Sequence, residues 1–180
     1  MNTIVYRRVV SDDDLFEIIK LQKRNITASI SIEEQLNEGF VTVQHDLETL
    51  KMMNDACAHI IAIHNNTIVG YALSMLNSFK NTIEVLKPMF KEIETCISPN
   101  VSYITMGQIC VDKNYRKQGV FKGLYNYMKS ELNTVFDIII TEVDIKNTRS
   151  LNAHYAIGFN LLKRYTCNNQ EWALLFWKWQ

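Results

Sequence analysis

The sequence predicts an α/β (α+β) fold in which helices pack on a central mixed sheet that is partly antiparallel. Two observations lead to this prediction. Residues 59–76 have the pattern of a β-hairpin, and the second half of the chain alternates between strand and helix patterns. At 180 residues with 47% apolar composition, the chain is long enough to bury a substantial core around such a sheet.

The N-terminal part is expected to contain one strand and three capped helices. β-branched residues at 4–10 indicate the strand. Ser11, followed by three aspartates, is typical of a helix N-cap. Ser31 to Glu34 form the capping box S-x-x-E of a second helix, which is expected to end at Gly39. Asp46 is expected to cap the third helix.

A hairpin and a further helix follow. Residues 59–64 and 67–76 are the two strands of the hairpin, because Asn65-Asn66 between them suits a two-residue turn with positive φ. Apolar residues repeat at helical spacing over 82–93. Pro88 within this stretch is expected to kink the helix or to weaken it.

The second half of the chain has the clearest pattern. Residues 102–111 read as a strand, and a polar, glycine-containing loop at 112–121 leads into an amphipathic helix. The apolar face of that helix consists of Phe121, Leu124, Tyr125, Met128 and Leu132. The remaining elements are a strand at 136–143 that is buried on both faces, a helix at 150–156 that ends at Gly158, and strands at 159–166 and 171–179.

Composition argues against several classes of protein. Nineteen Lys and Arg balance nineteen Asp and Glu, so a broad attraction to nucleic acid or to an anionic membrane is not expected. The first residues do not resemble a signal peptide, and no apolar run approaches the ~18 residues of a membrane span. Four scattered cysteines predict reduced thiols in a cytoplasmic protein, and no metal motif is present. Residues 1–180 contain no linker and are expected to form a single domain.

The loop between the strand and the helix is a candidate anion site. A helix that begins directly after a strand leaves backbone N–H groups free at the positive end of its dipole, which suits a phosphate. Gly119 allows a ligand to approach the backbone, and Arg116, Lys117 and Lys122 add positive charge. The alternative is an ordinary strand-to-helix turn with solvated cations. From this loop alone, the ordinary turn is the favoured interpretation.

Two motifs in this half of the chain follow one another at a fixed spacing. The first is Arg116-x-x-Gly119-x-Phe121, within the loop. The second is Val143-Asp144-x-x-Asn147-x-x-Ser150-x-x-x-His154-x-x-x-Gly158-Phe159. Over roughly residues 101–160 this pattern resembles the GNAT superfamily of N-acetyltransferases, whose acetyl-CoA signature is Q/R-x-x-G-x-G/A. Phe121 departs from the small residue that is usual at the third position.

The resemblance implies a GNAT-like fold with a mostly antiparallel sheet, helices on both faces and one splayed pair of parallel strands. These would be the strand ending near Val111 and the strand at 138–143. It implies acetyl-CoA as co-substrate and no metal, with the pyrophosphate on the loop and the pantetheine pairing with backbone between the splayed strands. The implied cofactor-binding residues are Ile109, Cys110, Val111, Arg116, Lys117, Gln118, Gly119, Val120, Phe121, Lys122, Asn147 and His154.

The strand that ends near Val111 raises two further questions. Alternation along it would place Ile104, Met106, Gln108 and Cys110 on one face, which either points toward the substrate or leaves Gln108 in solvent. A cysteine near a thioester suggests a covalent nucleophile. Because no His or Asp lies at a useful spacing, we interpret Cys110 as a small buried apolar residue.

The resemblance also suggests catalytic residues. The family's usual general acid is a tyrosine seven residues after the asparagine, where this chain has His154. His154 either protonates the departing thiolate or packs against the cofactor. Glu142 is the first candidate for the general base, and Asp144 shares its face of the strand, although each can instead be a salt-bridged or solvated acid. Further candidates to line the amine site are Glu38, Tyr71 and Tyr103.

The implied function is transfer of an acetyl group from acetyl-CoA to a primary amine of a small molecule or peptide, by direct attack on the thioester. The alternative is a non-catalytic acyl-CoA-binding or sensing module with the same fold, which the departures at Phe121 and His154 keep open. A third interpretation is an interaction domain in which the motifs are coincidental. The aromatic strand at 171–179 is a candidate edge for a homodimer.

Overall fold

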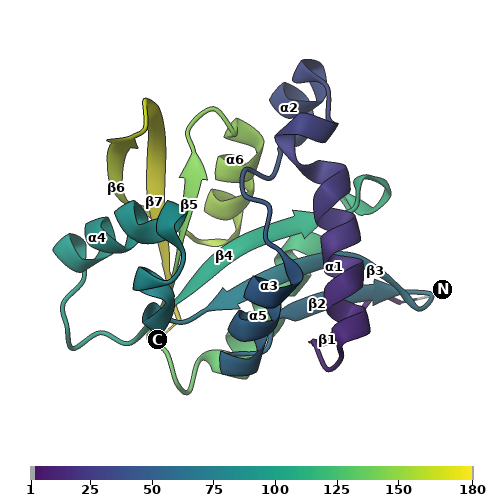
Figure 1. Cartoon of the computed structure of the whole chain (residues 1–180), viewed down its shortest axis with the longest axis horizontal. Helices are drawn as coiled ribbons and strands as arrows, with labels where there is room; N and C mark the ends of the chain where they lie inside the picture. The colour runs from purple at the N-terminus through teal and green to yellow at the C-terminus, as the bar shows by residue number, and fades with distance from the viewer. Residues whose placement is uncertain (1–2, 180) are drawn as a thin grey trace.

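The computed structural model describes residues 3–179, whose strands form one seven-stranded sheet in the order β1-β2-β3-β4-β5-β7-β6 (Figure 1). All neighbouring strands are antiparallel except β4 and β5, which are parallel. The mixed, mostly antiparallel sheet is therefore confirmed. The strands are β1 Val5–Arg8, β2 Ile60–His64, β3 Thr67–Met75, β4 Tyr103–Val111, β5 Ile138–Asp144, β6 Asn160–Cys167 and β7 Gln170–Lys178.

The helices found in the described residues cover both faces of this sheet. One apolar core lies beneath α1, α3 and α4, and a second core beneath α5 and α6. The α-helices are α1 Asp12–Asn25, α2 Ile32–Glu38, α3 Leu47–Ala56, α4 Lys87–Cys96, α5 Val120–Leu132 and α6 Thr148–Ile157. Short 3₁₀ turns connect some of them: η1 Thr27–Ser29, η2 Asn77–Asn81, η3 Glu84–Leu86 and η4 Lys113–Tyr115.

Local sequence signals explain where most of the N-terminal elements begin. The side chains of Ser11, Ser31 and Asp46 each accept a hydrogen bond from the backbone N–H three residues later, as their predicted capping roles require. Asn65 and Asn66 adopt φ values of 49° and 59°, so the turn between β2 and β3 also has the predicted conformation.

Two helix boundaries differ from the prediction. The α4 helix begins at Lys87, with Pro88 in its first turn, so the proline starts the helix and does not kink it. Residues 84–86 form the η3 turn instead of the helix predicted over 82–93. The α6 helix begins at Thr148, because the side chain of Asn147 accepts a hydrogen bond from the N–H of Ser150 and caps it.

The last strand is not an edge of the sheet, which corrects the proposed homodimer edge. β7 lies between β5 and β6, and the two edge strands are β1 and β6. Antiparallel pairing of the final two strands places β7 inside and leaves β6 outside. The aromatic residues of β7 pack on both faces of the sheet, with Phe176 against one core and Trp177 against the other.

A β-bulge at Gly107 breaks the regular alternation of β4. Leu73 on β3 is opposite Gln108, whereas the next residue, Ser74, is opposite Met106, so Gly107 is the extra residue. Before the bulge, Met106 and Ile104 face the α5 side of the sheet. After it, Cys110 faces the α1 side. The prediction that alternate residues from Ile104 to Cys110 share one face is therefore wrong.

The bulge lies where β4 and β5 separate. Their parallel pairing covers only residues 103–105 of β4 and 138–140 of β5. Immediately beyond it, the hydroxyl of Thr141 donates to the backbone carbonyl of Met106 at 3.1 Å. In Figure 1 the arrows of the two strands start side by side and point apart, β4 toward α1 and β5 along α6. This opening is the splayed parallel pair that the resemblance implied.

Candidate functional site

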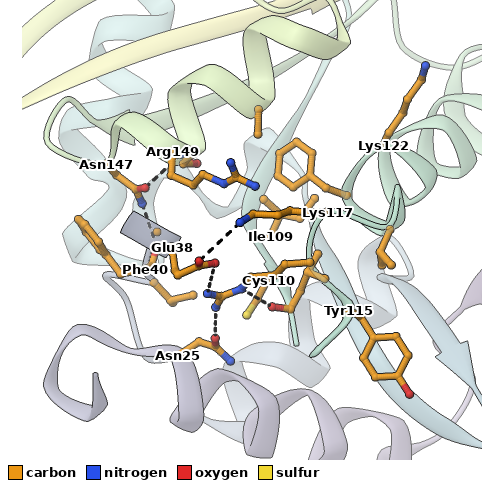
Figure 2. Close-up of a pocket in the computed structure, with 18 of the residues that line it drawn as sticks. Asn25, Glu38, Phe40, Ile109, Cys110, Tyr115, Lys117, Lys122, Asn147 and Arg149 are labelled. Carbon is orange, nitrogen blue, oxygen red and sulfur yellow. Dashed lines mark hydrogen bonds and ion pairs between the residues drawn. The ribbon is translucent and has the colours of Figure 1, made fainter. Parts of the chain in front are cut away.

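A cavity of about 330 Å³ lies at the open ends of β4 and β5 (Figure 2). Its walls come from the end of β4, the loop at 115–119, the first turns of α5 and α6, and the segment that follows α2. The lining includes Asn25, Glu38, Gly39, Phe40, Val41, Ile109, Cys110, Val111, Tyr115, Arg116, Lys117, Gly119, Val120, Phe121, Lys122, Asn147, Arg149, Ser150, Ala153, Ala156 and Ile157. Most predicted cofactor residues therefore meet around one space.

The loop before α5 has the shape of an anion cradle. Lys117 and Gly119 have φ values of 62° and 84°, a left-handed conformation that turns successive backbone N–H groups to one side. Gly119 is also the N-cap of α5, so the N–H groups of Val120, Phe121 and Lys122 precede the first bond of the helix, which runs from Gly123 to Gly119. A Cβ at Gly119 would meet no atom of a more distant residue within 4 Å, so there is open space beside this glycine, which also lines the cavity.

The ladder between β3 and β4 directs backbone groups of β4 into the same opening. Asp112 donates its backbone N–H to the Val69 carbonyl at 2.8 Å. Hydrogen-bonded and non-bonded pairs alternate in an antiparallel ladder, so Val111 and Ile109 direct their backbone polar groups away from β3 and toward β5. Because the pairing between β4 and β5 has already ended, these groups face the cavity, where the carbonyl of Val111 also accepts a hydrogen bond from Arg116 at 3.3 Å. This is the arrangement expected for pairing with an extended ligand.

The three predicted cations, Arg116, Lys117 and Lys122, differ in where their side chains lie. Arg116 extends away from the loop, donating to the side chain of Asn25 at 2.6 Å and to that of Glu38 at 3.4 Å. The ammonium of Lys117 lies 4.0 Å from Glu38, while Lys122 points away from the cavity in Figure 2. Sequence reasoning missed Arg149, an exposed residue at the start of α6 that lines the cavity, because arginine is unremarkable in a first helical turn.

The other predicted loop residues are placed as follows. Gln118 donates to the backbone carbonyl of Asn114 and is not among the cavity residues. Val120, the first residue of α5, is buried in the core and lines the inner wall of the cavity. The ring of Phe121 packs edge-on against His154, with 5.0 Å between ring centroids, so it turns toward α6 and leaves its backbone N–H for the loop.

Asn147 connects the start of α6 to the segment that follows α2. Its side-chain oxygen caps α6, and its amide nitrogen donates to the carbonyl of Phe40 at 3.0 Å. The segment 40–43 after α2 is thereby held across the opening between β4 and α6. Asn147 is buried, so this pairing satisfies both polar atoms of its side chain.

A second cavity of about 70 Å³ adjoins the first on the far side of this segment. It extends along β5 and includes Glu142, Gln108, Trp172 and His154 in its lining. Residues that line both cavities mark the place where they meet. They are Phe40, Val41, Ile109, Asn147 and Ser150.

Glu142 and Asp144 both line the second cavity, and as alternate residues of β5 they lie on the same face of the strand. Burial raises the pKa of Glu142 to about 7, although the hydroxyl of Tyr165 donates to its carboxylate and acts in the opposite direction. The carboxylate of Asp144 accepts from the backbone N–H of Lys146 and the side chain of Gln170, both at 2.8 Å. Glu142 is therefore the acid whose proton is exchanged near neutral pH.

His154 lies in the core beneath Phe121 and is only 1% exposed. One ring nitrogen, Nδ1, is 2.7 Å from the backbone carbonyl of Ser150, which can only accept, so Nδ1 carries the hydrogen. The other, Nε2, is 2.7 Å from the hydroxyl of Tyr125. Burial lowers the pKa of His154 to about 4, so the ring is neutral at pH 7 and accepts the proton of Tyr125.

The remaining candidates are structural neighbours of the site. Burial raises the pKa of the Cys110 thiol to about 12, which keeps it protonated and supports its interpretation as an apolar residue. Tyr71 donates to Gln108, whose amide donates to the carbonyl of Val43 at 2.6 Å and holds the segment after α2. Tyr103 lies at the other end of β4, beside the paired part of β5.

The features of a metal centre and of a membrane-spanning helix are absent from residues 3–179. No group of three or more metal-binding side chains occurs in residues 3–179. In the same part of the chain, no helix combines the length and the apolar character that crossing a bilayer requires. The four cysteines, Cys57, Cys96, Cys110 and Cys167, carry free thiols.

Buried histidines predict acid sensitivity. Burial lowers the pKa of His59 to about 3, that of His154 to about 4 and that of His45 in the same direction, so between about pH 6.5 and 4 these histidines bind more protons in the unfolded chain than in the folded chain. Glu142, with its raised pKa, offsets one of these protons between about pH 7 and 4.5. We expect the free energy of unfolding to fall by roughly 1–2 kcal/mol per pH unit from pH 6 to 4.5. Urea unfolding at pH 7, 6 and 5 measures this, and a constant value would contradict it.

Comparisons with known proteins agree with this geometry. A sequence model of the acetyltransferase (GNAT) family matches residues 17–159. The fold is similar to a chain of the NatC complex bound to Gag peptide and CoA, with 19% identity, 99% of each chain covered and a TM-score of 0.68. It is also similar to the ribosomal-protein-S18-alanine N-acetyltransferase from Escherichia coli (13% identity, 98% of this chain and 94% of that chain, TM-score 0.65).

A third similar structure is a putative acetyltransferase from Salmonella typhimurium with its cofactor acetyl-CoA. It shares 12% identity over 99% of this chain and 95% of that chain, with a TM-score of 0.63. A sequence search of curated proteins found no match. At these identities the structural comparisons establish a shared fold.

Proposed function

Because the chain belongs to the GNAT family of acetyltransferases, we propose that it transfers an acetyl group from acetyl-CoA to a primary amine. The observation that carries this proposal is the loop at 115–119, which opens α5 directly onto the gap between β4 and β5. One end of the cavity suits a diphosphate and the other offers backbone groups to an extended chain. Acetyl-CoA has both parts in that order.

The residues present fit the cofactor. The left-handed conformation at Lys117 and Gly119 provides N–H donors for the pyrophosphate, and the space beside Gly119 has room for it. The pantetheine arm would pair with the backbone of Ile109 and Val111, as a strand pairs with its neighbour. Lys117 and Arg149 supply positive charge at the entrance.

In the reaction, the cofactor supplies an activated acyl group, and the chain positions it and manages protons. A backbone N–H at Ile109 or Val111 would polarise the thioester carbonyl. Glu142 would accept a proton from the acceptor's ammonium group, because the pKa of its carboxyl is about 7 and it lines the adjoining cavity. The neutral amine then attacks the carbonyl directly.

The acceptor is a primary amine of a small molecule or a peptide. Similar folds occur in the NatC complex bound to Gag peptide and CoA and in the ribosomal-protein-S18-alanine N-acetyltransferase, which favours a peptide amine as the first substrate to test. Four free thiols suit a reducing compartment such as the cytoplasm.

One observation favours a second function. His154, at the position of the family's usual acid, is buried with both ring nitrogens in hydrogen bonds, so it does not face the cavities as a free proton donor. A chain that binds acyl-CoA without turnover would tolerate this arrangement. That function is a non-catalytic acyl-CoA sensor with the same fold.

Ligand-induced stabilisation and turnover distinguish these functions. We expect saturating CoA or acetyl-CoA at about 100 times its Kd to stabilise the fold by about 2.7 kcal/mol, seen as a rise of several degrees in Tm. Release of free thiol from acetyl-CoA is then measured across a panel of peptides and small amines. No shift with either ligand would contradict the proposal, whereas a shift without thiol release on any amine would favour the sensor.

A further inference from the structure

Ser150, in the first turn of α6, lies at the place where the thioester is expected to bind. The cofactor enters through the larger cavity, and the candidate base Glu142 lines the smaller one. The reacting carbon and sulfur must therefore lie where the two cavities meet. Five residues line both cavities, and only Asn147 and Ser150 among them have a side chain that can donate a hydrogen bond.

Asn147 is held in place by its existing bonds. Its amide nitrogen donates one of its two hydrogens to the carbonyl of Phe40 at 3.0 Å, and its oxygen accepts the backbone N–H of Ser150 at 3.2 Å. The side chain is therefore fixed between two backbone groups and cannot turn to follow a departing sulfur. The hydroxyl of Ser150 is the side-chain donor at the junction that can rotate toward it.

His154 leaves the Ser150 hydroxyl proton free. The two residues lie one turn apart on α6, with 3.4 Å between the serine Oγ and the histidine Nδ1. Because Nδ1 already carries a hydrogen and donates it to the Ser150 carbonyl at 2.7 Å, it cannot accept the hydroxyl proton. The histidine ring therefore holds Ser150 in position, and the serine hydroxyl can still donate its proton to another acceptor. The hydroxyl of Tyr125 holds the ring through Nε2.

We propose that Ser150 is a catalytic residue whose hydroxyl donates a hydrogen bond to the departing CoA sulfur. This inference rests on the proposed acetyl transfer. During transfer a C–N bond forms and the C–S bond breaks, and the sulfur leaves with the electron pair as a thiolate. The nitrogen loses one proton to Glu142 before attack and a second to solvent afterwards. Ser150 keeps its own proton, because an aliphatic hydroxyl is a far weaker acid than a thiol.

The position of Ser150 on the helix strengthens this role. Ser150 lies in the first turn of the ten-residue helix α6, where the backbone N–H groups give a positive potential. A thiolate near such a helix start is stabilised and has a lowered pKa. The hydroxyl and the helix start therefore act on the same developing charge. His154 contributes as a positioning residue, which is consistent with its burial.

The variant Ser150→Ala tests the proposal without disturbing the fold. The cap uses the backbone N–H of Ser150, which alanine retains, and alanine is the best helix former. We expect an unchanged Tm within a few degrees and a Kd for CoA within about threefold. We expect kcat to fall about 10- to 100-fold, because one donor to a developing anion is lost. Ser150→Thr, which keeps a hydroxyl, should recover most of the loss.

A measurement that needs no acceptor amine separates catalysis from structure. The pKa of the bound CoA thiol is obtained from the ultraviolet absorbance of its thiolate, using the complex with desulfo-CoA to subtract the protein's own cysteines. We expect this pKa to be about one unit higher in Ser150→Ala than in the wild type. An equal pKa and an equal kcat in the two proteins would overturn the role of Ser150. Failure of wild-type protein to bind CoA would overturn the proposed function, and this inference with it.

Discussion

Gly119→Asp is expected to weaken CoA binding at least about 100-fold, because like charges brought together in a binding site cost several kcal/mol. There is open space for a Cβ at this position, and Gly119 lines the cavity, so the new carboxylate would lie beside the proposed pyrophosphate site. The protein itself should remain folded, since no atom of the chain is displaced and aspartate tolerates the left-handed backbone better than most residues. Isothermal titration with CoA measures the effect.

Gly119→Asn is the matched control for this substitution. Asparagine has the same shape as aspartate and also adopts a φ near the 84° observed here, but it carries no charge. If the loop binds pyrophosphate, the asparagine variant should lose less affinity than the aspartate variant, and the difference should shrink at high salt. Equal Kd values for the wild type and Gly119→Asp would show that the diphosphate binds elsewhere.

Glu142→Gln is expected to lower kcat by about 10²- to 10⁴-fold, the usual contribution of a general base. The Kd for acetyl-CoA should change little, because Glu142 lines the smaller cavity only. Activity of the wild type should rise with pH through about 7, where Glu142 loses its proton, and this dependence should be absent from the variant. Steady-state rates from pH 5.5 to 9 with a fixed acceptor measure both effects.

Two neighbouring substitutions serve as controls for the base. Tyr165→Phe removes a hydrogen bond that favours the charged carboxylate, so the pH at which activity rises should move upward. Asp144→Asn changes the other acid on this face, which is already held by Gln170, and should leave the midpoint near 7. A Glu142→Gln enzyme with wild-type kcat and pH dependence would show that another group accepts the proton.

Local patterns in the sequence were sufficient to predict most of the elements. The caps at Ser11, Ser31 and Asp46 depend only on neighbouring residues, and the structure confirms them. The left-handed backbone at Gly119 is also typical of its residue type, whereas the binding of a cofactor at this loop was inferred from the resemblance and stays a prediction. The splayed strand pair followed from the resemblance over residues 101–160 and is present.

What sequence reasoning missed depends on contacts between distant segments. The bulge at Gly107 was not predicted, because it depends on how β4 pairs with β3 and because a glycine within a strand has several other uses. Arg116 was expected at the phosphates, but its partners Asn25 and Glu38 come from helices about 80 to 90 residues earlier in the chain. Ser150 was part of the quoted motif, yet its position between two cavities is visible only in three dimensions.

The bonds made by Arg116 limit how this protein can be redesigned. Its guanidinium joins the end of α1, the end of α2 and the carbonyl of Val111 on β4. In a chimera that received the first two helices of a relative in order to accept a different amine, the cofactor loop would lose its anchor unless Asn25 and Glu38 were retained. A library for altered selectivity should therefore keep these two positions constant and vary the segment 40–43, which touches both cavities without holding the loop.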